Sequence, residues 1–73
     1  MKVKDIVRKS FDGTRFDICD PTNETLFLGT GLDIYKNRDL IIEPGINLWD
    51  AKVLRIECYY DDELKKSVIM LHV

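Results

Sequence analysis

The chain ends in the segment KVLRIECYYDDELKKSVIMLHV, residues Lys52–Val73, and this segment decides the fold. Two apolar runs, Lys52–Tyr60 and Lys66–Val73, flank the segment Asp-Asp-Glu-Leu-Lys at residues 61–65. Side chains alternate in direction along a strand, so this spacing predicts a β-hairpin with one apolar face. An isolated two-stranded ribbon is marginally stable in water, so we expect the upstream residues to cover that face. The face comprises Leu54, Ile56, Cys58, Ile69, Leu71 and Val73.

The size and composition predict one small globular domain over residues 1–73. The chain is 45% hydrophobic and 33% charged, too apolar and too evenly patterned for a disordered protein. The net charge is −2, and Lys and Arg alternate with Asp and Glu, so nucleic-acid binding is not favoured. No apolar run approaches the roughly 20 residues of a membrane span, and no apolar segment follows the basic start as in a secretory signal. These features predict a cytoplasmic protein without a membrane partner.

Three short elements are predicted in the first half of the chain. Apolar residues at positions 3, 6 and 7 predict a helix over residues 2–9. Alternation of Phe16 and Ile18 with polar residues predicts a half-buried strand over 14–20. The turn residues Asp20–Glu24 then lead into a second strand over 25–29, antiparallel to the first.

The middle of the chain predicts a second helix and one weak strand. Thr30 followed by Asp33 matches a capping box, which predicts a helix over residues 31–37. Residues 40–43 form a short β-branched run, and Glu43-Pro44-Gly45 is a turn signal. The rest of residues 38–50 shows no clear helical or strand periodicity. Residues 40–43 are predicted as a short strand or extended edge.

These elements predict an α+β fold. It contains a three- to four-stranded, mainly antiparallel sheet and two short helices, in the order α-β-β-α-(β)-β-β, with the C-terminal hairpin as its core. The predicted core residues are Val3, Ile6, Val7, Phe16, Ile18, Leu28, Leu32, Leu54, Ile56, Ile69 and Leu71.

The chemistry-bearing residues do not predict an enzyme or a cofactor site. Cys19 and Cys58 are far apart and are expected to be free thiols, although neighbouring strands would leave a disulfide open to them. We expect Cys58 to be buried, Cys19 to be exposed, and His72 to lie on the outer face of the hairpin. One histidine and two distant cysteines do not supply a zinc site. The Cys58–His72 pair is expected on opposite faces, so we predict a non-catalytic protein with no metal and no cofactor.

The second face of the hairpin carries the candidate partner-binding residues. Tyr, Met and Arg are over-represented at protein interfaces, and this face contains Arg55, Tyr59 and Met70. Trp49, the only tryptophan, is either a lid on the core or a binding hot spot. This face is interpreted either as a surface for a protein partner or a second copy, or as ordinary half-buried surface. A further edge where an outside strand can add lies around residues 40–43.

The sequence resembles a loose group of small accessory proteins encoded by phages, prophages and conjugative elements of Gram-positive bacteria. The resemblance lies in Met1–Ile6, in Phe16-x-Ile18-x-Asp20, in Leu26–Thr30 and in the closing strands Val53–Glu57 and Val68–Val73. It covers most of the chain, whereas residues 40–46 and the loop of the hairpin depart from the pattern. The resemblance implies a protein that acts stoichiometrically, for example by blocking a host defence protein.

Two functional hypotheses follow. The first is a non-catalytic interaction protein that inhibits a host defence protein by binding it. The alternative is a homo-oligomer that binds or sequesters a small ligand such as a nucleotide signal, with its sites between subunits because one subunit is small.

Overall fold

The computed structural model describes all 73 residues and contains two short helices and six strands. Along the chain these are α1 (Val3–Val7), β1 (Arg15–Cys19), β2 (Thr25–Thr30), α2 (Gly31–Lys36), β3 (Ile41–Glu43), β4 (Ile46–Asn47), β5 (Arg55–Asp61) and β6 (Lys66–His72). The α+β prediction is confirmed, and each predicted helix is present with slightly shorter bounds. No helix has the length and apolar character needed to cross a membrane.

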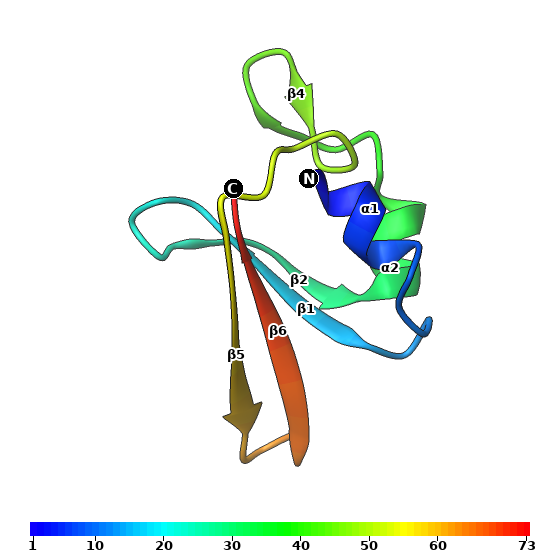
Figure 1. The fold of residues 1–73 in the computed structure, drawn as a ribbon, viewed down its shortest axis with the longest axis vertical. Helices are drawn as coiled ribbons and strands as arrows, with labels where there is room; N and C mark the ends of the chain where they lie inside the picture. The colour runs from blue at the N-terminus through cyan, green and yellow to red at the C-terminus, as the bar shows by residue number, and fades with distance from the viewer.

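The main sheet has four strands in the order β2-β1-β6-β5 (Figure 1). β1 pairs antiparallel with β2, as predicted, and parallel with β6. β5 and β6 form the predicted C-terminal hairpin, with a regular register from Arg55 opposite His72 to Asp61 opposite Lys66. The last strand therefore lies in the middle of the sheet, and β5 lies at its edge.

Turn chemistry explains how the two main hairpins close. Asp20 Oδ1 accepts hydrogen bonds from the N–H groups of Thr22 and Glu24, which fixes the turn between β1 and β2. In the β5–β6 turn, Asp61 Oδ1 accepts from the N–H groups of Glu63 and Leu64. The left-handed backbone that completes the second turn is supplied by Lys65, with φ of 53°.

Residues 38–50, which the sequence pattern left open, form a small second sheet above the core. β3 pairs antiparallel with β4, so the predicted strand at 40–43 is confirmed but does not join the main sheet. Gly45, with φ of 76°, makes the tight connection between them. Leu48 follows β4 and is fully buried, which anchors this segment to the core.

The core lies between the two helices and one face of the sheet. Both helices pack over β1 and β6 rather than over β5, and the β5–β6 hairpin projects away from them in Figure 1. The buried residues of this cluster are Val3, Val7, Phe16, Ile18, Ile34, Leu48, Ala51, Leu71 and Val73, with Ile6 and Ile69 partly buried against it.

Several predicted core residues are not buried. Leu54 and Ile56 are 67% and 52% exposed, and Cys58 is exposed too, so their assignment to the core was wrong. The side chains of Ile56 and Cys58 share the face of Leu71 and Ile69, as the alternation predicted, but β5 lies beyond the area that the helices cover. Leu54 precedes the paired residues of β5. Leu28 and Leu32 are also exposed, because Leu28 lies on the opposite edge strand, β2, and Leu32 lines an open groove beside α2.

The other face of the sheet is more buried than predicted. Cys19 and Val68 are fully buried there, and His72 is 5% exposed, although Cys19 and His72 were expected at the surface. These residues lie on the two central strands, β1 and β6, each of which has a neighbouring strand on both sides. Both cysteines are free thiols, as predicted.

Candidate interaction surface

β5 is a seven-residue edge strand with one side unpaired. It pairs with β6 along its whole length without a register shift, so no bulge interrupts its free edge. An edge of this kind presents a row of free N–H and C=O groups, and such rows are templates for pairing with another chain. β5 is therefore the main candidate for an interaction surface.

The hydrogen bonds of β6 show which β5 residues face outward. Val73 donates its N–H to the Cys19 carbonyl of β1, whereas the His72 carbonyl accepts from Leu54 beside β5. The N–H and C=O groups of successive residues point to opposite sides of a strand. Val68 and Met70 therefore direct their N–H and C=O groups toward β5, as His72 does. Their register partners on β5 are the odd-numbered residues, so Ile56, Cys58 and Tyr60 direct their N–H and C=O groups to the free edge.

The same strand carries an exposed apolar strip. Ile56, Cys58 and Tyr60 lie on the helix-bearing face of the sheet, beyond the area that the helices cover, and these residues and the preceding Leu54 are all exposed. At its upper end Leu54 also lines a hollow of about 250 Å³, together with Ile42, Ile46 and Val73. Contiguous exposed apolar surface on a small protein marks an interaction site.

The opposite face of β5 is tied to the interior by a polar network around Asp17. The carboxylate of Asp17, on β1, is buried and accepts hydrogen bonds from Thr25 Oγ1 (2.9 Å), Cys19 Sγ (3.3 Å) and Tyr59 Oη (3.3 Å). Burial raises the pKa of Cys19 to about 11, and its hydrogen bond to Asp17 adds to this effect. Cys19 is therefore a protonated structural thiol near neutral pH, rather than a nucleophile.

His72 lies at the end of the same face. Its Nε2 is buried without a hydrogen-bond partner and lies 3.4 Å from Glu57 Oε1. Glu57 in turn forms an exposed ion pair with Arg55 (2.6 Å) along β5. The Cys58 side chain lies on the other face of the hairpin from His72, as predicted, so the two residues do not form a nucleophile–base pair.

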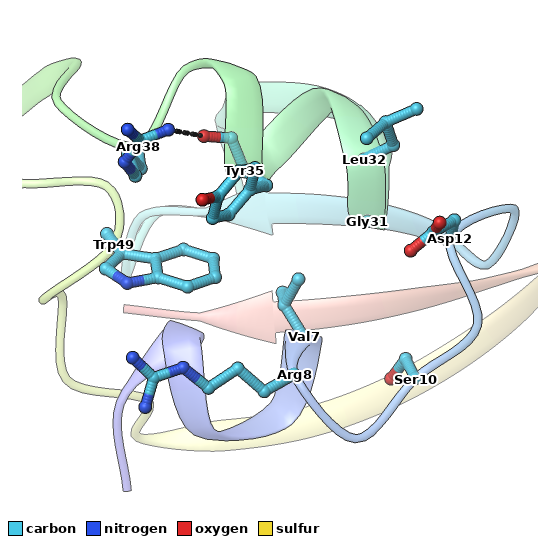
Figure 2. Close-up of a pocket in the computed structure, with 9 residues that line it drawn as sticks. All are labelled: Val7, Arg8, Ser10, Asp12, Gly31, Leu32, Tyr35, Arg38 and Trp49. Carbon is cyan, nitrogen blue, oxygen red and sulfur yellow. Dashed lines mark hydrogen bonds between the residues drawn. The ribbon is translucent and has the colours of Figure 1, made fainter.

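A second concave region lies between the two helices and the segment after β4. Figure 2 shows this groove, which has a volume of about 380 Å³. The Trp49 and Tyr35 rings meet edge to face with centroids 5.6 Å apart. The Arg8 guanidinium lies 5.7 Å from the Trp49 centroid, and that of Arg38 lies 4.5 Å from the Tyr35 centroid. Ser10, Asp12 and Leu32 complete the far end of the groove.

The four predicted partner-binding residues fall into two places. Arg55, Tyr59 and Met70 share one face of the β5–β6 hairpin, where Arg55 and Tyr59 are exposed and Met70 is half-buried. Trp49 lies in the groove between the helices and is half-buried. It packs against the core, as expected of a lid, and its ring also lines the groove. Sequence reasoning missed Ile56 and Tyr60 as surface residues, because the alternating pattern does not say which face of an edge strand is covered.

No group of three or more His, Cys, Asp or Glu side chains is placed to hold a metal ion. No protein-family model matches the chain, and neither a search of curated proteins nor a search of solved structures found a match.

Proposed function

We propose that this chain is a non-catalytic interaction protein that binds another polypeptide by adding a strand to the free edge of β5. The observation that carries the proposal is the unpaired, regular, exposed β5 with its apolar strip. In strand addition, main-chain hydrogen bonds supply affinity and alternate side chains supply specificity. Here the outward N–H and C=O groups of residues 56, 58 and 60 supply the main-chain hydrogen bonds. The side chains of Ile56 and Tyr60 supply the specificity.

The test uses a pair of substitutions at one position. Cys58→Pro removes an N–H that points to the free edge, so it is expected to leave the β5–β6 ladder intact. Cys58→Ser, the control, removes the same thiol but keeps the N–H. We expect tagged Cys58→Ser protein to retain every association of the wild type, with itself or with proteins of a host lysate, and Cys58→Pro to lose it. Equal binding by both variants, with the fold verified by circular dichroism, would contradict the proposal.

We also propose that the protein inhibits a host defence protein stoichiometrically and is cytoplasmic. The resemblance to mobile-element proteins implies the first of these properties, and the composition of the sequence implies the second. An interaction protein of this kind needs no cofactor, which agrees with the use of β5 as a binding edge rather than as part of an active site.

A second candidate function is favoured by the groove between the helices. Its volume of about 380 Å³ falls in the range of small-ligand sites, and it combines two aromatic rings with the guanidinium groups of Arg8 and Arg38. This chemistry suits a planar anion, such as a nucleotide. Unlike the site expected between subunits, this groove is formed within one chain.

The single tryptophan reports on this candidate directly. We expect AMP to change the fluorescence of Trp49 in a saturable way, and Arg38→Gln to weaken the effect. Lys36→Gln, which neutralises a nearby charge outside the groove, is the matched control. Inorganic phosphate, titrated in parallel, separates binding of the phosphate from binding of the base. A change in Trp49 fluorescence that rises linearly with AMP, without saturation, would contradict ligand binding in the groove.

A further inference from the structure

The charges along β5 are complementary to those of a second, antiparallel β5. Arg55, Glu57 and Asp61 share one face of the strand, with the positive residue at one end and the negative residue at the other. When two copies lie antiparallel with Cys58 opposite Cys58, Arg55 of each copy stands opposite Asp61 of the other. Opposite charges in directly facing positions stabilise an antiparallel pair.

We propose that the strand added to β5 is β5 of a second copy, in this register, with the two-fold axis passing between the two Cys58 residues. The inference rests on the proposed strand-addition function and names its partner. The product is an eight-stranded sheet, in the order β2-β1-β6-β5 followed by the same strands of the second copy in reverse. A two-fold interface of this kind is self-complementary and closed, so it does not propagate into a fibre.

The backbone supports the same register. Ile56, Cys58 and Tyr60 direct their N–H and C=O groups to the free edge, as the hydrogen bonds of His72 and Val73 imply. In the proposed register Ile56 faces Tyr60 and Cys58 faces Cys58. The outward N–H and C=O groups of one copy therefore face those of the other copy along the whole strand. A shift by one residue would bring outward groups opposite inward ones and move the side chains to the wrong face.

Registers shifted by two residues are disfavoured by charge. In an antiparallel pair, such a shift moves the two-fold axis by one residue, from Cys58 to residue 57 or to residue 59. An axis at residue 57 places Glu57 opposite Glu57 and separates Arg55 from Asp61. Moving it to residue 59 places Glu57 opposite Asp61 on both sides of the axis. Like charges in directly facing positions destabilise a strand pair, so of these three registers only the one centred on Cys58 places opposite charges opposite each other. A register centred on Ile56 would place Arg55 opposite Glu57, but it would pair only residues 55–57 of each β5.

The other edge of the sheet is less suited to this role. β2 contains a register irregularity against β1, between the pairs at Ile18 and Cys19, where Leu26 is the extra residue. Bulges of this kind twist an edge strand away from further pairing. β5 has seven consecutive pairs with β6 and no irregularity.

Charge substitutions test the register. Native mass spectrometry and light scattering would follow the monomer–dimer equilibrium from about 1 µM to about 1 mM, since a strand-pair interface is small and expected to be weak. Arg55→Asp places two acidic pairs across the axis and is expected to raise the dissociation constant about tenfold or more. Lys9→Asp makes the same charge change on the exposed residue after α1 and is expected to leave the equilibrium unchanged.

A second-site change separates the register from any effect on the monomer. Arg55→Asp also removes the ion pair with Glu57 on the same strand. Asp61→Asn, added to Arg55→Asp, relieves the repulsion across the axis while keeping the side-chain oxygen that accepts from Glu63 and Leu64. The double variant is therefore expected to dimerise more tightly than Arg55→Asp alone. Additive effects of the two substitutions would overturn the register.

Cross-linking gives an independent readout. Cys58 is the only exposed thiol, because Cys19 is buried. Facing residues in a hydrogen-bonded antiparallel pair have Cα atoms about 5.5 Å apart, so a short bismaleimide should join the two Cys58 residues in a wild-type dimer. Cys58→Ser should give no cross-link, and a wild-type dimer that also gives none would contradict the proposed axis.

The outcomes distinguish this inference from the function on which it rests. A wild-type protein that stays monomeric over the whole range, while Cys58→Ser but not Cys58→Pro captures a foreign protein, overturns self-pairing and supports strand addition. A dimer that is equally stable in Cys58→Pro overturns both. A dimer that is lost in Cys58→Pro and weakened in Arg55→Asp supports both.

Discussion

The hydroxyl of Tyr59 on the edge strand β5 donates a hydrogen bond to the buried carboxylate of Asp17 on β1, 3.3 Å away and across the intervening strand β6. β5 has no helix over it, so this bond is one of few ties between the strand and the interior. Burial of the hydroxyl, the charge of the nearby Asp17 carboxylate and the hydrogen bond to it all raise the pKa of Tyr59. Tyr59, predicted as a partner-binding residue, therefore also positions the proposed binding edge.

We expect Tyr59→Phe to lower the free energy of unfolding by about 1 to 2 kcal/mol, because it removes a hydrogen bond to a buried charged group. Asp17 keeps its bonds from Thr25 and Cys19, so the loss is partial. Chemical denaturation of the monomer measures it. Tyr60→Phe is the control, since the exposed Tyr60 hydroxyl makes no hydrogen bond and its loss should cost less than about 0.5 kcal/mol. Equal effects would show that Tyr59 does not anchor β5.

The two leucines of the hairpin test where the core lies. Leu71 is fully buried under the helices, so Leu71→Ala is expected to cost about 2 to 5 kcal/mol. Leu54→Ala makes the same chemical change on an exposed side chain and is expected to cost less than about 1 kcal/mol. Thermal unfolding of both variants decides the question. A large loss in Leu54→Ala would restore the core position that the sequence pattern predicts for it.

The sequence predicted the elements of this fold better than their environments. Alternation placed Ile56 and Cys58 on the face of Leu71, and the structure confirms this shared face. Alternation cannot show that β6 is central and β5 is an edge, because strand order depends on the parallel pairing of β1 with β6. That long-range pairing buries Cys19 and His72 and exposes Ile56, contrary to the prediction for each.

The candidate site was predicted in part for the same reason. Arg55, Tyr59 and Met70 were assigned to the correct hairpin, but the free backbone of β5 could be found only once β6 was known to bond to β1 on its other side. The groove was not predicted, because Arg8, Tyr35, Arg38 and Trp49 come from distant segments. Their only local signal was the single tryptophan in a stretch without clear periodicity.

The cap of α2 is a local feature that the sequence predicted fully. Thr30 Oγ1 accepts from the Asp33 N–H (3.2 Å), and Asp33 Oδ2 accepts from the Thr30 N–H (2.9 Å). Thr30→Ala is expected to cost about 1 kcal/mol. Gly29→Ala is expected to be destabilising as well, since a Cβ there would lie 2.9 Å from the Asp33 Cβ. Thermal unfolding checks both, and Gly13→Ala, where a Cβ meets no atom within 4 Å, is the control for replacing a glycine.

The hydrogen bonds of this cap also predict acid sensitivity. They hold the pKa of Asp33 below its usual value of 3.8. Because the folded chain binds this proton less readily than the unfolded chain, the stabilisation is present above that pH and is lost as the pH falls through the lowered pKa. The difference in stability between the wild type and Asp33→Asn should therefore shrink as the pH drops below about 4. A difference that stays constant would contradict the role of the ionised carboxylate.

Alkaline pH is expected to destabilise the protein through Cys19. The pKa of this thiol is about 11 in the folded chain against 9.0 as its ordinary value, so between these values the unfolded chain has lost a proton that the folded chain keeps. The folded state then binds more protons, and the free energy of unfolding falls as the pH rises, by about 2 kcal/mol across this window. Cys19→Ala should flatten the fall, although Tyr59, whose pKa is also raised, maintains part of it. Cys58→Ala removes an exposed thiol and should leave the profile unchanged, so an identical flattening in both variants would rule out burial of Cys19 as the cause.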